Sequence, residues 1–313
     1  MNDAINRWLV EDTPWCKYAV ETQLLDLKSD ASTVIRDKYI SSIIKRLKDN
    51  QVGIPALKSG KVPYTSTGNA FWDLYFLADI GLSSKDIGID DEIEEFFKLQ
   101  MPDGSFVLQA GTKPSYYCIT SIILSSLAKI GYGDDLRISK FLQNVFESQR
   151  LDGGWHCAIS RAKGKKLQDS ESCPMDNLNI LMLLGQYKDF RMDKRFNGAI
   201  DLILNHWRKR SEKWRPYGFG IGTEFIKLKY PVVKYGILRV LDVLSAFPYA
   251  VQSNEFKEML DLTLKKSSDG KYYADSVSRS YSEFDFGQTK ELSRWITFLV
   301  NRIQKRVRVY KIR

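Results

Sequence analysis

The chain has few of the residues that build disulfide frameworks or metal centres, since its 313 residues include four cysteines and two histidines. Four cysteines in a chain of this length do not make a disulfide framework. Residues 1–7 lack the apolar stretch of a signal peptide. No apolar run approaches the roughly 18–20 residues that span a bilayer, and serine and lysine interrupt the nearest one, residues 119–130. We therefore expect a cytoplasmic protein without a transmembrane segment.

Strand and nucleotide-binding patterns are also missing. No run alternates in polarity as a half-buried strand does. Residues 215–222, Arg-Pro-Tyr-Gly-Phe-Gly-Ile-Gly, have the glycine spacing of a phosphate loop, but no strand precedes them and no Gly-Lys-Ser/Thr follows. We interpret this segment as a lid, with Arg215 and Lys234 available to bind a phosphate or carboxylate.

The net charge of +9 is spread along the chain. Lysine and arginine alternate with 38 acidic residues, and the one dense basic run is the C-terminal tail, residues 305–313. This distribution does not indicate nucleic-acid binding. A basic tail is usually a solvated end, and the alternative is peripheral contact with anionic lipid or an acidic partner. The sequence does not indicate an oligomeric state.

One turn motif recurs along the chain. Its fullest copy is Gln149-Arg-Leu-Asp-Gly-Gly-Trp155, in which a helix ends, the chain reverses and Trp155 returns to the core. Weaker copies are Gln100-Met-Pro-Asp-Gly-Ser-Phe106 and Ser268-Asp-Gly-Lys-Tyr272. The turns at Asp103 and Asp152 are 49 residues apart. Such a spacing indicates a repeated supersecondary unit.

Two kinds of helix alternate between these turns. One kind is apolar nearly all round and the other carries a single apolar stripe, as inner and outer helices of two concentric rings require. We predict an all-α, single-domain α/α toroid over residues 1–313, with about six hairpins; a solenoid of stacked hairpins is the alternative. The predicted helices cover residues 7–27, 32–48, 65–82, 90–99, 115–130, 134–149, 173–184, 193–210, 232–247, 254–265 and 291–303, and residues 50–64 are predicted to be loop.

These features resemble the prenyltransferase and terpene-cyclase toroid superfamily, whose repeats end in Gln, pass through Asp-Gly-Gly/Ser-Trp/Phe and begin a new inner helix. A closer likeness is to bacterial and archaeal toroid proteins without an assigned reaction, at residues 152–157 (Asp-Gly-Gly-Trp-His-Cys) and 284–287 (Phe-Asp-Phe-Gly) among others. The resemblance implies an enzyme acting on an isoprenoid or other elongated apolar substrate in a central cavity. The Asp-rich DxDD motif of class II terpene cyclases is missing, so the reaction is not implied.

Two other classes of function stay open. The chain could be a non-catalytic module that presents a peptide, lipid or protein partner at the barrel mouth. It could also be a glycan-active enzyme, which needs two facing carboxylates roughly 5–9.5 Å apart. Asp176 with Glu283 or Asp285 is the pair that we nominate for that reaction. The sequence does not decide whether the protein is an enzyme.

A metal site is one candidate for the mouth. Cys118, His156, Cys157 and Cys173 are predicted to converge there beside Asp176, and such ligands suit tetrahedral zinc. Protein prenyltransferases and lanthionine cyclases also hold zinc at a toroid mouth, but their motif order is not reproduced here. The alternatives are a redox-sensitive Cys157–Cys173 pair and plain packing.

Acids and aromatic residues complete the candidates. Asp176, Glu283 and Asp285 are candidate catalytic acids, which burial would equip as general acids; pairing with Lys290 or Arg294 is the alternative. Aromatic rings can stabilise cations and accept isoprenoid chains, or simply fill the core. The candidate substrate-binding residues are Tyr64, Trp72, Tyr116, Trp155, Arg215, Tyr235 and Trp295. We interpret Asp134-Asp135 as a helix cap and His206 as a structural or surface residue.

Overall fold

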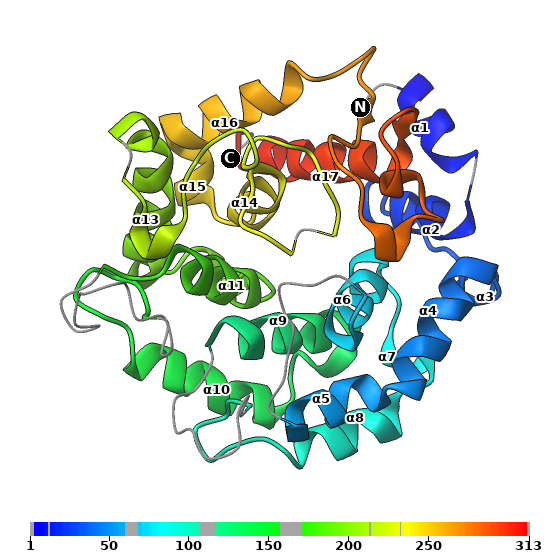
Figure 1. Ribbon diagram of the computed structural model, residues 1–313, viewed down its shortest axis with the longest axis horizontal. Coiled ribbons are helices and arrows are strands. Elements are labelled where there is room, and N and C mark those ends of the chain that lie inside the picture. Colours follow the sequence, from blue (N-terminus) through cyan, green and yellow to red (C-terminus); the bar gives the residue numbers. More distant parts are fainter. Residues whose placement is uncertain are drawn as a thin grey trace.

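The computed structural model describes residues 3–11, 13–59, 68–106, 117–156, 171–212, 214–231 and 233–311. These residues are mostly helical, and the helices are arranged around a common centre (Figure 1). The outer helices are α1 (Asp3–Val10), α4 (Lys38–Asp49), α8 (Asp90–Phe97), α10 (Leu136–Glu147), α13 (Asn197–Arg208) and α16 (Asn254–Leu264). The inner helices are α2 (Pro14–Gln23), α6 (Ala70–Ile80), α9 (Tyr117–Leu127), α11 (Pro174–Leu184), α14 (Ile237–Leu244) and α17 (Arg294–Lys311).

Shorter elements connect the inner and outer helices. A two-residue antiparallel ladder pairs β1 (Tyr272–Tyr273) with β2 (Leu292–Ser293) ahead of α17. The short helices are α3 (Ser32–Ile35), α5 (Ile54–Ser59), α7 (Ser84–Ile87), α12 (Lys188–Arg191) and α15 (Pro248–Gln252). Among the described residues, no helix combines the length and the apolar character needed to cross a membrane.

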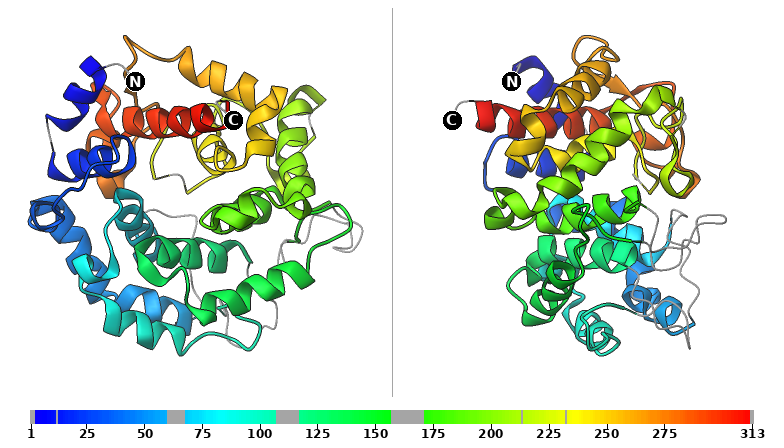
Figure 2. Two further views of the ribbon diagram at one scale, coloured as in Figure 1. Left: turned by 180° about the vertical axis from the view of Figure 1, so that it is seen from behind. Right: turned by 90° about the vertical axis from the view of Figure 1, so that its left-hand side faces the viewer.

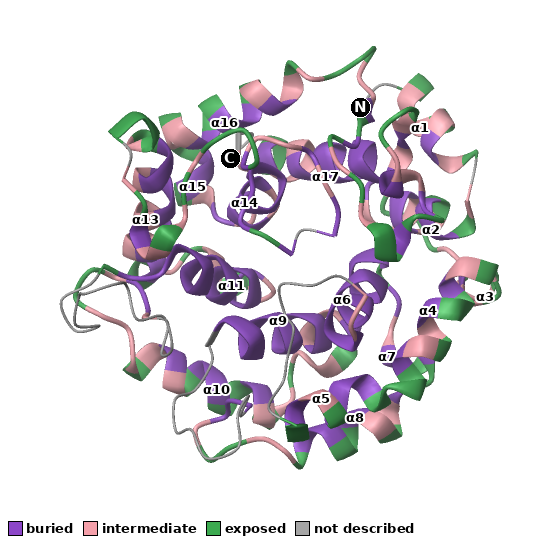
Figure 3. Cartoon of the chain, viewed as in Figure 1, coloured by how far each residue is buried: buried purple, intermediate pink, exposed green. Residues whose placement is uncertain are grey.

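Burial separates the two kinds of helix as the sequence predicts. Every residue of α6 and α11 is at most 7% exposed. The outer helix α10 instead buries one stripe, which consists of Ile138, Phe141, Leu142 and Val145. Figure 3 shows this contrast, with buried inner helices and outer helices that are exposed on their outward faces. A helix surrounded by protein must be apolar on most sides, whereas a surface helix needs only one apolar face.

The inner helices contact one another in succession along the chain: α2 with α6, α6 with α9, α9 with α11, α11 with α14, and α14 with α17. The last of them, α17, also contacts α1 and α2. Lys305 Nζ in α17 donates to the carbonyl oxygen of Gln23 at 3.1 Å. The beginning and the end of the described chain therefore lie side by side (Figures 1 and 2).

The repeated turn has the same hydrogen bonds in its two fullest copies. Gln100 Nε2 donates to the carbonyl oxygens of Gly104 (2.7 Å) and Arg137 (2.8 Å). Gln149 Nε2 donates in the same way to Gly153 (2.7 Å) and Arg195 (2.8 Å). In each copy the glutamine at the end of an outer helix therefore fixes both its own turn and the start of the next outer segment. Trp155 returns to the core as predicted, and its indole N–H donates to the carbonyl oxygen of Val145.

These turns require glycine for two reasons: the backbone has a positive φ, and there is no room for a Cβ atom. Gly153 has φ +84°, and a Cβ there would lie 2.6 Å from the Cα of Gly198 in α13. Gly104 meets the backbone of Phe141 in α10 in the same way. In the third copy, a Cβ on Gly270 would lie 2.4 Å from the side chain of Ile5. The third turn therefore packs against α1, just as the other two pack against the outer helices that follow them.

Some predicted boundaries are wrong. Residues 7–27 form two helices instead of one, because the chain breaks before Pro14, which begins α2. The predicted loop 50–64 contains α5. Helix α14 begins at Ile237 and not at residue 232, after Pro231, which lacks an amide donor, and after the extended Gly236.

The basic tail also differs from the prediction. Residues 305–311 continue α17 and are not a solvated end. Arg306 donates to Asp242, Val307 is buried, and the hydroxyl of Tyr310 donates to the carbonyl oxygen of Ala246 at 2.8 Å. The apolar and aromatic positions among the basic residues hold this segment against α14.

Candidate functional site

A pocket lies at the end of the molecule where the inner helices begin, which we call the mouth. It is formed between the segments that precede α14 and α17 and has a volume of about 500 Å³. We call it the mouth pocket; its lining residues are Glu224, Lys229, Tyr230, Pro231, Val233, Lys234, Ser276, Val277, Ser278 and Arg279.

Hydrogen bonds fix the two segments to each other. The backbone N–H of Asp275 donates to the carbonyl oxygen of Leu228 at 2.6 Å, and the N–H of Leu228 donates to the Asp275 carboxylate at 2.7 Å. Lys266 Nζ contacts the same carboxylate at 2.5 Å. The mouth pocket therefore has a defined wall although neither segment is a regular helix or sheet.

Positive charge dominates the mouth pocket, because Lys229, Lys234 and Arg279 face one lining carboxylate, Glu224. Lys229 Nζ lies 3.7 Å from that carboxylate and donates to the Glu224 carbonyl oxygen at 3.3 Å. Burial lowers the pKa of Lys229 and outweighs the raising effect of Glu224. An additional anion near Lys229 would favour its charged form.

Tyr230, whose peptide bond to Pro231 is cis, lines the mouth pocket but is only 1% exposed, so its ring presents almost no surface to the pocket. This ring packs against Phe286 and Trp295, with centroids 5.0 Å and 5.6 Å away. Its hydroxyl donates to Oδ2 of Asp79 at 3.1 Å. Tyr230 therefore connects the mouth pocket to the centre of the helix arrangement.

The described side chains at the centre are closely packed. Trp72, Tyr75 and Arg239 are buried, and the Arg239 guanidinium lies 5.5 Å from the Trp72 ring centroid. Arg239 also donates to Asn179 of α11. A side chain that lined a water-sized void would expose surface to it. Because these residues expose almost none, the described part of the chain leaves little open space against them.

The three candidate acids are in different environments. Asp176, in the first turn of α11, is 1% exposed. Asp285 is half-buried in the short turn Asp285–Gly287 ahead of α17, and its Oδ2 accepts from Ser293 Oγ and from the N–H of Trp295, both at 3.0 Å. Burial raises the pKa of Asp285, and these hydrogen bonds reduce the rise. Its partners are not the expected Lys290 and Arg294 side chains. Glu283 is exposed, so it is not a buried acid.

The predicted metal ligands are only partly described, because Cys157 lies outside the described residues. Cys118 and Cys173 are buried on α9 and at the start of α11, and half-buried His156 lies beside Tyr217. In the ranges that the structure describes, no group of three or more His, Cys, Asp or Glu side chains could hold a metal ion. A zinc site that includes Cys157 remains a prediction.

The candidate substrate-binding residues do not form one surface. Tyr64 and Tyr116 lie outside the described residues. Trp72, Trp155, Tyr235 and Trp295 are buried in the hydrophobic core. Arg215 is exposed and lines a neighbouring pocket of about 270 Å³ with Trp214 and Gly220. Glu224 lines this pocket as well as the mouth pocket.

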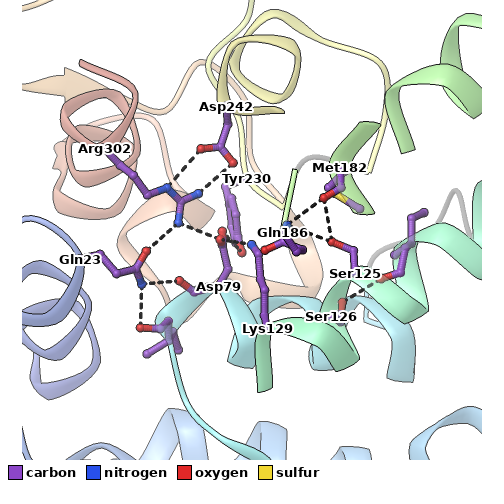
Figure 4. A network of polar contacts seen from close by, with 12 residues as sticks. Gln23, Asp79, Ser125, Ser126, Lys129, Met182, Gln186, Tyr230, Asp242 and Arg302 are labelled. Carbon is purple, nitrogen blue, oxygen red and sulfur yellow. Dashed lines mark hydrogen bonds and ion pairs between the residues drawn. The ribbon is translucent and has the colours of Figure 1, made fainter. Parts of the chain in front are cut away.

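A buried ion network lies at the opposite end of the inner helices, and sequence reasoning missed it (Figure 4). Arg302 of α17 donates to Asp79 of α6 at 2.8 Å, to Asp242 of α14 at 2.9 and 3.1 Å, and to Gln23 of α2 at 3.1 Å. Lys129 also donates to Asp79, at 3.1 Å. Burial alone would raise the pKa of Asp79, but Arg302 and Lys129 hold it well below its usual range.

A second missed ion pair is on the mouth half of α6. Arg46 donates to both oxygens of buried Asp73, at 2.6 and 2.7 Å, and the Tyr281 hydroxyl donates to the same carboxylate at 2.9 Å. The sequence does carry a signal for these sites. Asp73 and Asp79 lie within an otherwise apolar helix, where a charged residue needs a partner because it is buried.

Comparisons with known proteins do not assign the chain to a family. No protein-family model matches it, and no curated protein matches its sequence. Among solved structures it is similar to the type II terpene cyclase MstE from Scytonema, with 10% identity, a TM-score of 0.39, and coverage of 96% of this chain and 89% of that chain. A single-residue variant of that cyclase in complex with its substrate, geranylgeranyl dihydroxybenzoate, gives 10% identity, a TM-score of 0.36 and coverage of 96% and 88%. Such low TM-scores carry no argument about activity.

Proposed function

We propose that the chain is a closed α/α toroid of about six hairpins, of the prenyltransferase and terpene-cyclase type, and that it binds an elongated apolar molecule with an anionic end, such as an isoprenoid, at its mouth. One observation supports this ligand: three cations line a pocket that also contains the exposed apolar side chain of Val277. The closed ring is supported by the contacts of α17 with α1 and α2 and by the packing of the Gly270 turn on Ile5.

The mouth pocket suits such a ligand in size and in chemistry. Its volume of about 500 Å³ falls within the roughly 300–1,000 Å³ of typical small-molecule sites. Lys229, Lys234 and Arg279 would hold the anionic end by charge-assisted hydrogen bonds. Val277, which is exposed, would contact the apolar part.

Asp285 is our candidate acid if the bound molecule reacts. The residue is half-buried, desolvation of its carboxyl raises its pKa, and it precedes Phe286, which packs against the Tyr230 ring. A buried carboxyl of this kind can hold a proton that it later transfers to substrate. Its two hydrogen bonds at the start of α17 fix its position.

The second candidate function is a binding module without turnover. The observation that favours it is the close packing of the centre by Trp72, Tyr75 and Tyr230. In this case the ligand stays in the mouth pocket and no reacting group enters the ring. The Asp285 carboxylate then has only a structural role, in which it accepts a hydrogen bond from the N–H of Trp295 in the first turn of α17.

Binding can be measured by titration calorimetry with farnesyl diphosphate, farnesol and inorganic pyrophosphate as separate probes. We expect the diphosphate to bind more tightly than either of its parts, because only it contacts both the cations and the exposed side chain of Val277. In the double variant Lys234→Ala, Arg279→Ala its affinity should fall by about 10- to 100-fold, as expected for the loss of one or two charged hydrogen bonds. Lys257→Ala, an exposed lysine on α16, is the matched control.

The outcomes separate the proposals. If none of the three probes binds, or if the double variant binds as the wild type does, the mouth pocket is not the site. If the wild type converts the diphosphate and Asp285→Asn binds it without converting it, the protein is an enzyme with Asp285 as its acid. Binding without any product supports the module.

A further inference from the structure

A second pocket lies at the end of the molecule opposite to the mouth, where the inner helices end. We call it the distal pocket. It has a volume of about 90 Å³, and its polar lining residues are Lys129, Gln186, Arg191, Asp242, Arg306 and Tyr310. Lys129 and Gln186 directly follow α9 and α11, Asp242 lies in the last turn of α14, and Arg306 and Tyr310 are in the second half of α17.

Cations outnumber carboxylates around the distal pocket. Lys129, Arg191 and Arg306 line it, and the only acidic lining residue in the described chain is Asp242. Asp242 is already bound by Arg302 through both of its oxygens, at 3.1 and 2.9 Å. When Arg302 and its partner Asp79 are included, four cations are close to two carboxylates. The cluster therefore has an excess of two positive charges.

The two arginines of the distal pocket have N–H donors that make no hydrogen bond to any residue that the structure describes. Arg191 donates through Nε to the carbonyl oxygen of Gly185 at 2.8 Å, and it has no ion pair within the described ranges. Arg306 uses Nη1 for Asp242 and Ser245, which leaves Nη2 available. Burial and the neighbouring Arg302 and Arg191 lower the pKa of Arg306. An anion bound beside Arg306 would therefore stabilise its charged guanidinium group.

We propose that the distal pocket binds a small oxyanion, such as inorganic phosphate or sulfate, between the guanidinium groups of Arg191 and Arg306. Guanidinium groups match the oxygens of phosphate in geometry as well as in charge. The cavity far exceeds the roughly 10–15 Å³ that one water needs, yet it is much smaller than typical sites for organic ligands. The anion would join α12 to α17 and so fasten the last helix at the end opposite to the mouth.

The test is a titration of the full chain with sodium phosphate at constant ionic strength, followed by calorimetry and by the midpoint of thermal unfolding. We expect saturable binding and a midpoint that rises with phosphate, because a ligand of the folded state stabilises it. Arg191→Gln should weaken binding at least tenfold, and Arg191→Lys, which keeps the charge but not the fork, should have an intermediate effect. The matched control is Arg195→Gln, whose arginine is exposed and paired with Asp193.

Two further arms identify the site and the ligand. The mouth variant Lys234→Ala, Arg279→Ala should bind phosphate as the wild type does, since its changes lie at the other end. Glycerol 3-phosphate should bind more weakly than phosphate if the natural ligand is a free anion, and equally well if a phosphoryl group of a larger molecule enters. No saturable binding to the wild type, or loss of binding in the mouth variant alone, would overturn the proposal. Circular dichroism of the arginine variants checks that they fold.

Discussion

At the scale of single residues, His206 shows how burial lowers the pKa of an imidazole. Its ring is 0% exposed, with Nδ1 3.2 Å from the Tyr235 hydroxyl and Nε2 3.1 Å from the Phe219 carbonyl oxygen. Burial lowers its pKa to about 4 from the ordinary 6.5, although the hydrogen bond to Phe219 acts in the opposite direction. The structural role predicted for His206 is therefore confirmed by its contacts.

This pKa predicts a dependence of stability on pH. Because the folded protein favours the neutral imidazole, the stabilisation is complete above pH 6.5 and is lost as the pH falls through 4. The loss should reach about 3 kcal/mol of unfolding free energy, from 1.36 kcal/mol for each unit of pKa shift. Urea unfolding of the wild type and His206→Gln at pH 7 and pH 4 isolates this contribution. An equal loss in both proteins would show that other groups cause it.

At the scale of elements, the connections between helices depend on glycines for two distinct reasons. Gly153 has φ +84° and is in close contact with the backbone of Gly198, whereas Gly218 has φ +80° and nothing within 4 Å of a Cβ position. A comparison of alanine substitutions at these two glycines therefore distinguishes the cost of backbone strain from the cost of steric crowding. Both arguments start from a glycine that is visible in the sequence, but only the tertiary contact distinguishes them.

We expect Gly218→Ala to lower the unfolding free energy by about 1 kcal/mol, the cost of a left-handed alanine. Gly153→Ala should cost at least about 2 kcal/mol more, because α13 must also move away. Denaturant unfolding measures both values. Equal losses in the two variants would mean that the turn at Gly153 can shift without disturbing α13.

At the scale of the whole molecule, Arg302 joins helices that are far apart in the sequence. It contacts Gln23 of α2, Asp79 of α6 and Asp242 of α14 (Figure 4). Removing it would leave two buried carboxylates with fewer partners. Such losses are much larger than the loss of an exposed ion pair.

We predict that Arg302→Met lowers the unfolding free energy by about 3–5 kcal/mol. Arg195→Ala, which removes an exposed pair with Asp193, should cost about 0–1 kcal/mol. The double variant Arg302→Met, Asp79→Asn should recover part of the loss, because it removes an uncompensated charge. A loss below about 1 kcal/mol for Arg302→Met would show that solvent reaches this network.

The sequence predicted the features that depend on local patterns. The periodicity of apolar residues located most helices, the caps and glycine turns marked several ends, and the alternation of helix types predicted which helices lie inside. The predicted role of Asp135 as a helix cap is confirmed, since its side chain accepts a hydrogen bond from the N–H of Arg137 at the start of α10. The errors at residues 50–64 and 305–311 arose because packing, and not propensity, decides whether short or highly charged segments are helical.

The sites were less predictable, because each brings together residues from distant segments. By itself the sequence determined the helical class, the two kinds of helix and the turns between them, since period, capping and backbone angle are local properties. Only the tertiary structure decided that Glu283 is exposed while Asp285 is half-buried, that Lys229, Lys234 and Arg279 line one pocket, and that Arg302 contacts Asp79. Charge pairing and pocket formation depend on which helices become neighbours, and that is a property of the assembled chain.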